Sequence, residues 1–213
     1  MRKIITLAAA AIIIASCTNT TNTTNTADNT GARCVRPMPA AYNADSLADC
    51  TVPAQFKLAD FDWTAGTLTL TVYSEDIYDA VDISQLKAGD TIVYQGRNIV
   101  VAQIDDKDGF KTINGGIEND GADLQAGDGG TYRAIQLDDH AVYTTLGKAT
   151  LPLADNLVVI DCGIEPTDPV DTIRTAAAAY LQKPGQRDDF TELNTRVLVE
   201  GGKITQIARH WIP

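Results

Sequence analysis

The densest group of side chains able to do acid–base chemistry is the run Leu137–Tyr143, LDDHAVY. It places His140, one of two histidines in the chain, beside two aspartates. A histidine oriented by a carboxylate can act as a general base near neutral pH. In an extended strand Asp138 shares a face with His140 and Asp139 does not, so Asp138 is the expected partner. The alternative is a polar turn, because no GxSxG, HExxH or SxxK motif accompanies the pair.

A second group of side chains could bind calcium. Asp105, Asp106 and Asp108 precede Gly109 and supply the oxygen ligands that calcium prefers. The full spacing D-x-[DN]-x-[DN]-G-x₅-E is not met, and Asp-Gly is also common chemistry for a tight hairpin turn. The sequence therefore leaves open a loose calcium site or a turn. We expect no other metal or cofactor, because two histidines and no paired cysteines do not make a zinc site.

The glycine-rich stretch Asn114–Gly130, NGGIENDGADLQAGDGG, is interpreted as a long loop. Long loops in compact domains are often functional. It lacks the following helix and the lysine of a phosphate-binding loop. We therefore expect it to contact a protein, a glycan or a small ligand. The polar residues assigned to that surface are Asn114, Glu118, Asp120, Asp123 and Asp128.

The end of the chain combines a cation and an aromatic ring, Arg209 and Trp211. Carried on a strand, the two could stack on a ligand or a sugar. A tryptophan in this position more often fills the end of a barrel, and we adopt that interpretation.

Alternation of apolar and polar residues dominates the elements that must position these groups. Thr67–Tyr73, TLTLTVY, is typical of a half-buried antiparallel strand. Gln55–Trp63 also alternates, with a slip at Ala59-Asp60 that indicates a bulge. The turn Thr64–Gly66 would join the two strands into a hairpin. Short apolar runs separated by tight turns then predict a three-stranded meander, with strands at 91–94, 99–104 and 110–113.

One helix is expected between Thr167 and Leu181. Asp168 can cap it, Pro169 suits its first turn, and Pro184-Gly185 ends it. The predicted fold class is therefore mainly β, an antiparallel small barrel or sandwich with one packed α-helix in the C-terminal half.

The N-terminus has the features of an export signal. Arg2 and Lys3 precede the apolar run Ile4–Ile14, about eleven residues or roughly 16 Å of helix, which is about half of a hydrocarbon core. The run is too short to span a membrane and fits the apolar region of a signal peptide.

Ile14-Ala15-Ser16-Cys17 resembles the lipobox of bacterial lipoproteins. The resemblance covers residues 1–17 and implies that residues 1–16 are removed and that Cys17 carries lipid. By the same resemblance, threonine rather than aspartate at position 18 favours an outer-membrane anchor facing the periplasm. The segments ARHWIP and DDHAVYTTLG resemble exported bacterial proteins of unknown function, which implies no activity.

Residues 17–32 are expected to form a tether. Thr18–Thr30 is polar and of low complexity, so it should be disordered, with a root-mean-square reach of roughly 20 Å. Residues 33–213 are expected to form a single β-rich domain.

Charge and cysteines narrow the partners. The full chain carries −11, and without residues 1–16 it has 28 acidic and 15 basic residues, a net −13. This acidity argues against nucleic acid and against flat contact with anionic lipid. In an oxidising compartment, Cys34 and Cys50 would enclose a short irregular loop, and we predict a disulfide there, worth ~3 kcal/mol. Cys162 would remain as an inert thiol.

The sequence favours a lipid-anchored, exported, non-catalytic binding or assembly module and does not identify its ligand. Two alternatives stay open. One is an exported hydrolase that uses His140 with Asp138. The other is a calcium-binding surface module.

Overall fold

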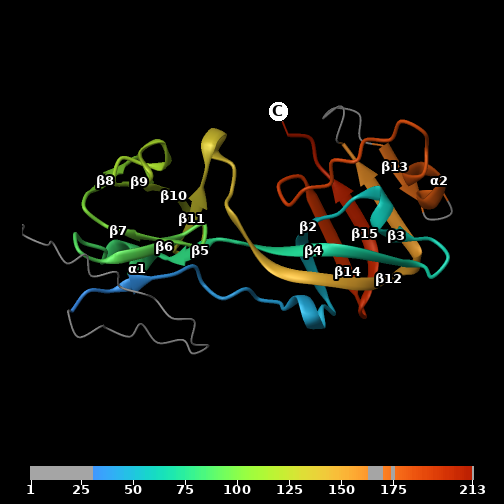
Figure 1. Ribbon diagram of the computed structural model, residues 1–213, viewed down its shortest axis with the longest axis horizontal. Coiled ribbons are helices and arrows are strands. Elements are labelled where there is room, and N and C mark those ends of the chain that lie inside the picture. The colour runs from blue at the N-terminus through green and yellow to red at the C-terminus, as the bar shows by residue number, and fades with distance from the viewer. Residues whose placement is uncertain (1–30, 163–169, 174–175, 213) are drawn as a thin grey trace, which may run out of the picture.

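The computed structural model describes residues 31–162, 170–173 and 176–212, and it is mainly β, as the sequence predicted. The described strands form three sheets around two separate hydrophobic clusters. Figure 1 shows two lobes, joined by a pair of long strands. We call residues 31–35 and 77–142 the inserted lobe, and the described residues of 42–75 and 143–212 the barrel lobe. The expected single domain thus contains two cores.

Five strands close the barrel lobe into a ring. Each pairs with two others, in the circular order β2–β4–β12–β15–β14–β2, and only β12 and β15 run parallel. A five-stranded barrel of this kind is the architecture of OB-folds. Here a whole lobe is inserted between β4 and β12. The five strands are β2 (Cys50–Gln55), β4 (Thr67–Glu75), β12 (Tyr143–Asp161), β14 (Thr195–Glu200) and β15 (Lys203–Arg209).

The barrel interior is filled by alternate residues of its strands. On β4, the predicted alternation is confirmed, since Leu68, Leu70 and Val72 are all buried in one cluster. Strand β3 (Phe61–Asp62) pairs with β4, which confirms the predicted hairpin. The predicted bulge is wrong, because the 3₁₀ turn η2 (Leu58–Asp60) separates β2 from β3.

Strand β12 is shared between two ladders. Its first half runs antiparallel to β4, from Tyr143 opposite Glu75 to Pro152 opposite Thr67. Its second half runs parallel to β15 and antiparallel to β13 (Val170–Ile173). This one 19-residue strand therefore closes the barrel and also carries the chain back from the inserted lobe.

The inserted lobe contains two open sheets, with orders β1-β6-β7 and β5-β11-β10-β9-β8. The predicted hairpins β6–β7 and β8–β9 are present, but they belong to different sheets and so do not form one meander. The strands are β1 (Cys34–Val35), β5 (Ile77–Asp79), β6 (Thr91–Tyr94), β7 (Arg97–Val100), β8 (Ile104–Lys107), β9 (Phe110–Ile113), β10 (Ala122–Gly127) and β11 (Thr131–Ile135). A short helix, α1 (Ala80–Ser84), follows β5.

Two expected elements are wrong. The stretch Asn114–Gly130 is not one loop, because it contains the 3₁₀ turn η3 (Ile117–Asn119) and strand β10, whose Ala122 and Leu124 are buried. The expected helix is largely replaced by β13, and only α2 (Ala177–Leu181) is helical. The predicted capping residues at 168 and 169 lie outside the described residues.

The predicted Cys34–Cys50 disulfide is not present in the structure. The two residues belong to different lobes, because β1 pairs with β6 whereas β2 pairs with β14 and β4. The segment between them is therefore no edge loop but runs from one lobe to the other. Cys162 follows β12 and is half-buried.

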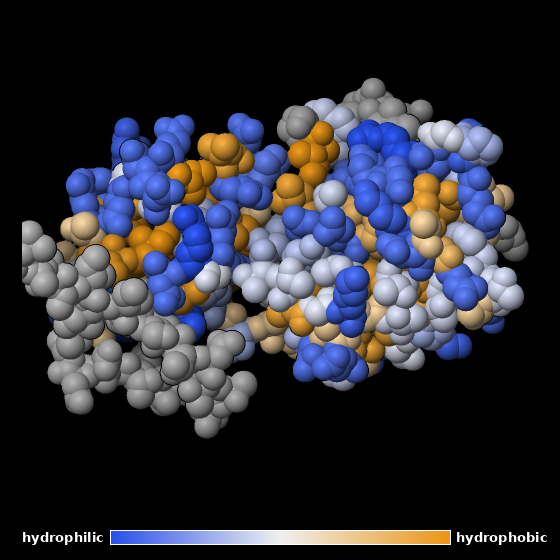
Figure 2. All heavy atoms as spheres, viewed as in Figure 1, coloured by the Kyte–Doolittle hydropathy of each residue, from blue (hydrophilic) through white to orange (hydrophobic). Residues whose placement is uncertain are grey.

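The predicted signal peptide, the lipid-bearing Cys17 and most of the tether lie outside the described residues. Among the helices that the structure describes, none has the length and apolar character needed to cross a membrane. Figure 2 shows a largely hydrophilic surface and a narrowing between the two lobes.

Candidate functional site

The two lobes meet at a narrow waist. The chain passes through it at Asp76, at Val142 and in the segment 36–41. The Asp76 amide donates to the Val142 carbonyl at 2.9 Å, and the Val142 amide donates to the Ala134 carbonyl at 3.0 Å. The β4–β12 ladder therefore continues into the inserted lobe and fixes the two crossing strands relative to β11.

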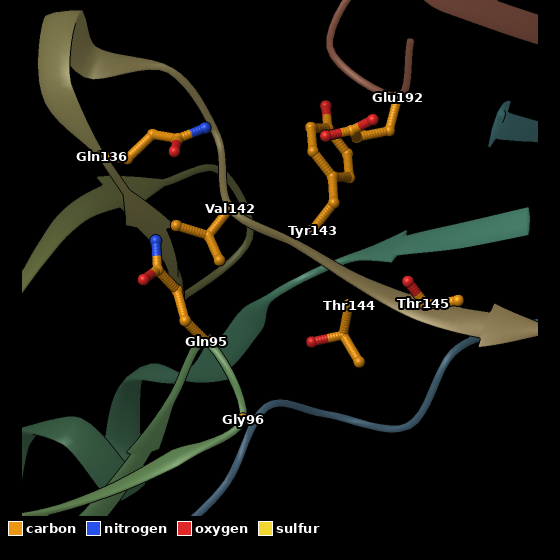
Figure 3. A pocket seen from close by; sticks show the side chains of 8 residues that line it. All are labelled: Gln95, Gly96, Gln136, Val142, Tyr143, Thr144, Thr145 and Glu192. Carbon is orange, nitrogen blue, oxygen red and sulfur yellow. The ribbon is translucent and has the colours of Figure 1, made fainter. Parts of the chain in front are cut away.

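A hollow of about 370 Å³ lies at this waist. Figure 3 shows the glutamines of the inserted lobe on one side and Tyr143 with Glu192 on the other. We call this hollow the waist cleft. Its lining residues are Gln95, Gly96, Gln136, Val142, Tyr143, Thr144, Thr145 and Glu192.

Tight turns position the two glutamines. Gln95 and Gly96 form the turn between β6 and β7, and both have positive φ, 51° and 70°, as a two-residue hairpin turn requires. Gln136 follows β11, and its side-chain amide donates to the Ala141 carbonyl at 3.2 Å. The side-chain carbonyl of Gln136 is thereby held in place, while the Gln95 side chain is exposed.

Arg196 organises the opposite wall. Its Nη2 donates to the Tyr143 hydroxyl at 2.5 Å, and its Nη1 donates to the Glu192 carbonyl at 2.8 Å. The guanidinium carbon lies 5.3 Å from the centroid of the Tyr143 ring, a cation–π distance. Burial raises the pKa of Tyr143, and the charge of Arg196 opposes this in part. The phenol is therefore neutral at pH 7, and its own O–H remains available to donate.

A buried carboxylate adjoins the cleft. Asp76 is 2 % exposed, and its Oδ2 has no hydrogen-bond partner among the described residues. Burial raises the pKa of Asp76, hydrogen bonding with Thr144 lowers it, and the nearby Glu75 raises it further. Because Thr144 also lines the cleft, the protonation of Asp76 is connected to the cleft wall.

The wall thus offers amides, hydroxyls and one carboxylate, and none of its lining residues is a cation. Amides and hydroxyls both donate and accept hydrogen bonds, whereas a carboxylate only accepts them. Such a wall suits a neutral, hydroxyl-rich ligand better than an anion. Within the described ranges, no group of three or more His, Cys, Asp or Glu side chains is arranged to hold a metal ion.

The predicted pair of Asp138 and His140 is not brought together. Leu137–Asp139 forms the 3₁₀ turn η4, in which Asp138 and Asp139 have φ near 60° and are exposed. No ion pair joins His140 to a carboxylate in the part of the chain that the structure describes. The structure therefore has the polar turn that the sequence left open as the alternative.

The three candidate calcium ligands are also separated. Asp105 and Asp106 are neighbours on β8 and point to opposite faces of the sheet. Asp105 accepts from the Gln103 amide at 2.9 Å, and Asp106 forms an ion pair with Lys111. Asp108 has a positive φ in the β8–β9 turn. This is the tight hairpin turn that the sequence left open as the alternative to a calcium site.

The residues expected to form a contact surface divide into two groups. Asn114 accepts from the Ala102 amide at 2.8 Å, and Asp123 accepts from the Ile117 amide at 3.0 Å, so both hold the backbone in place. The side chains of Glu118, Asp120 and Asp128 are exposed. Only these three remain available to a partner.

Sequence reasoning missed a buried ion cluster. Arg209 is 1 % exposed and donates from Nε and Nη2 to both oxygens of Asp161, at 2.9 and 2.5 Å. It also binds Asp189 and stacks on Phe190, with 4.3 Å between the guanidinium and the ring centroid. Burial alone would lower the pKa of Arg209, but the two aspartates outweigh it and raise the pKa. Trp211 does not fill the barrel end, since it is 42 % exposed.

None of the cleft residues was predicted from the sequence to be functional. They come from four separate turns and strand ends, and only the turn at Gln95-Gly96 had a local signal. Searches of protein-family models, of curated proteins and of solved structures find no match to this chain.

Proposed function

We propose that this chain is a lipid-anchored, exported binding module that holds a small, neutral, hydroxyl-rich ligand of sugar size in the waist cleft. The composition of the cleft wall carries the proposal. Its volume of about 370 Å³ lies at the lower end of the range of small-ligand pockets, ~300–1,000 Å³.

The hydrogen-bonding groups of the wall support a sugar. A sugar hydroxyl donates one hydrogen bond and accepts others, so it matches side chains that do both. Gln95 and Gln136 offer such amides, Thr144 and Thr145 offer hydroxyls, and Glu192 adds a strong acceptor. An anionic ligand would meet the Glu192 carboxylate without a cation in the lining.

The proposal is for binding rather than catalysis. Glycoside hydrolysis generally uses two carboxyl groups on either side of the scissile bond. Glu192 is the one carboxylate among the residues that line the cleft, and Asp76 is buried behind it. A single carboxylate is sufficient to orient a sugar.

The location follows from the lipobox resemblance at Cys17 and its polar tether. A diacylated cysteine gives durable membrane attachment, whereas one acyl chain is marginal. A tether with a reach of roughly 20 Å would leave the cleft accessible to ligands from solution. We place the anchor in the outer membrane, facing the periplasm.

A ligand screen by thermal unfolding tests the binding function. Glucose, galactose, N-acetylglucosamine and their disaccharides would be added at about 10 mM, and a ligand well above its Kd stabilises the folded state. We expect at least one to raise the melting temperature. Gln136→Ala removes a hydrogen bond to the ligand, and Glu192→Gln replaces a charge-assisted hydrogen bond with a neutral one, so each should weaken binding by about tenfold or more.

Thr69→Ala provides the control, because Thr69 bonds Thr150 on the outer side of the barrel, away from the cleft. Its affinity for the sugar should equal that of the wild type. If no sugar shifts the melting temperature, or if the cleft variants bind as well as the control, the proposal fails.

The anchor is tested separately. Mass spectrometry of protein purified from membranes of the native host should find an acylated Cys17 as the first residue. Cys17→Ser should release the protein from the membrane fraction. An unprocessed chain without lipid would contradict the anchored location but would not affect the sugar test.

A further inference from the structure

A second hollow, of about 390 Å³, lies at the waist and shares no lining residue with the waist cleft. One wall is the segment Met38–Tyr42 that connects the lobes, and another is the edge of β2 at Pro53. Most of these side chains are apolar. Glu75 and Arg196 also line it, and they place two opposite charges in an otherwise apolar hollow. We call it the second cleft.

Arg196 has unused hydrogen-bonding capacity there. A guanidinium carries five N–H groups. Nη1 donates to the carbonyls of Glu192 and Thr195, and Nη2 donates once, to the Tyr143 hydroxyl. One Nη2–H and the Nε–H therefore have no partner among the described residues, and no carboxylate in that part of the chain forms an ion pair with Arg196.

Glu75 is the matching anion. Its side chain is half-buried, and no hydrogen bond or ion pair to its carboxylate is present in the described part of the chain. Glu75 and Arg196 act on the same two phenols, since Glu75 raises the pKa of both Tyr42 and Tyr143 whereas Arg196 lowers them. The two charges therefore lie near one another but are not paired with each other.

We propose that the second cleft binds a small zwitterion, a free amino acid or a dipeptide with an apolar side chain. Its carboxylate would accept from the two remaining N–H groups of Arg196, and its ammonium group would donate to Glu75. Half-buried charges without partners are costly, and a ligand with both charges supplies each with a charge-assisted hydrogen bond. The apolar walls formed by Met38, Pro39 and Pro53 would hold the side chain.

Isothermal titration of the full chain with L-leucine and with L-alanyl-L-leucine tests this site. We expect saturable binding of at least one of them at pH 7. Blocking either charge, by N-acetylation or by C-amidation, should weaken binding by about tenfold or more. A ligand that binds equally well after acetylation would reveal only an anion site and would overturn the proposal.

Variants assign the two ends of the ligand. Glu75→Gln keeps the shape of the side chain and should remove the preference for a free amino group, so the free and acetylated ligands should bind alike. Arg196→Lys keeps the charge but loses the two-pronged geometry and should weaken both ligands. Circular dichroism verifies that each variant is folded.

Glu200→Gln is the matched control, because Glu200 is an exposed glutamate on the same strand as Arg196. It should bind the zwitterion as the wild type does. Absence of saturable binding to the wild type, or a Glu75→Gln variant that discriminates as the wild type does, refutes the second site. Neither result bears on sugar binding, because the probes differ and Glu75 does not line the waist cleft.

Discussion

The barrel lobe and the inserted lobe are both β, but they are held together differently. The barrel closes through strands far apart in the chain, as where Val52 of β2 lies opposite Val197 of β14. In the inserted lobe, β8 to β11 pair in chain order. Local pairings form at lower entropic cost than distant ones. We therefore infer that strands β8 to β11 of the inserted lobe can order from one continuous chain segment, whereas the barrel needs segments from both sides of the insertion.

The two lobes also differ in their open strand edges and in the charges that they bury. The barrel ring has no open edge, whereas β8 is an edge of the inserted lobe and carries Asp105, Asp106 and Lys107, which disfavour pairing with another chain. The barrel buries the paired charges of Arg209 and Asp161. Each lobe can consequently be perturbed by a change that leaves the other intact.

Removal of the inserted lobe should have the largest effect. Glu75 and Tyr143 are directly paired at the end of the β4–β12 ladder, so residues 76–142 can be replaced by the two-residue turn Asn-Gly. The shortened chain should keep a folded barrel with cooperative unfolding and lose the sugar binding that needs Gln95 and Gln136. Far-UV circular dichroism and calorimetry measure this. An unfolded product would show that the barrel depends on the inserted lobe.

Arg209→Met should be the most damaging single change. It leaves the Asp161 carboxylate buried without its cation, which typically costs about 3–5 kcal/mol of unfolding free energy. Both tryptophans, Trp63 and Trp211, belong to the barrel lobe, so their fluorescence in a denaturant titration reports the loss. Arg187→Met, which removes a more exposed pair with Asp189, should cost less than about 1 kcal/mol. Equal losses would mean that the buried cluster has no special role.

Gly121→Ala should destabilise the inserted lobe by about 3 kcal/mol. A β-carbon at this position would lie 1.9 Å from the Ile113 carbonyl oxygen, so the backbone of the adjacent strand must move. Gly129→Ala is the control, because its φ of +68° disfavours alanine but no atom lies within 4 Å, and it should cost only about 1 kcal/mol. Amide hydrogen exchange of β9 and β10 measures both. If the barrel strands lost as much protection from hydrogen exchange as β9 and β10, the two lobes would not be independent.

Asp76→Asn should have the smallest effect and the opposite sign, a gain of about 1 kcal/mol at pH 7 from removal of a buried carboxylate with an unpartnered oxygen. Burial raises the pKa of Asp76 in the folded state, so its destabilising charge is absent below the ordinary aspartate pKa. It develops as the pH rises through the raised value. The stability difference between variant and wild type should therefore grow from pH 3 to pH 7. A constant difference would show that ionisation of Asp76 is not responsible.

Much of the fold could be predicted from local patterns. Alternation identified β4 and its hairpin with β3, and Asp-Gly or Gln-Gly turns identified the hairpins β8–β9 and β6–β7. Helical spacing misled at 170–173, because this segment pairs with β12 as a strand and the tertiary pairing outweighs the local pattern. Strand β10 was missed because its glycines outweighed the buried pair Ala122 and Leu124.

The candidate site could not be predicted because no local pattern encodes it. Gln95, Gln136 and Glu192 are far apart in the chain and meet only after the barrel has closed around β12. That closure was itself hidden, since Gly147 and Pro152 divide one long strand into two apparent segments. The conspicuous polar cluster at 138–140 is a turn. Aspartates are common in turns because they hydrogen-bond the nearby backbone and tolerate a left-handed conformation.

The shared strand β12 also determines where the chain can change length. One residue added between Gly147 and Leu153 would exchange the inward and outward side chains of the ladder beyond it. Between Leu153 and Val158 the register already shifts, because these residues face Ile204 and Gln206 on β15, so six residues of β12 lie opposite three of β15. Tolerance of insertions and deletions along β12 should therefore be confined to residues 154–157.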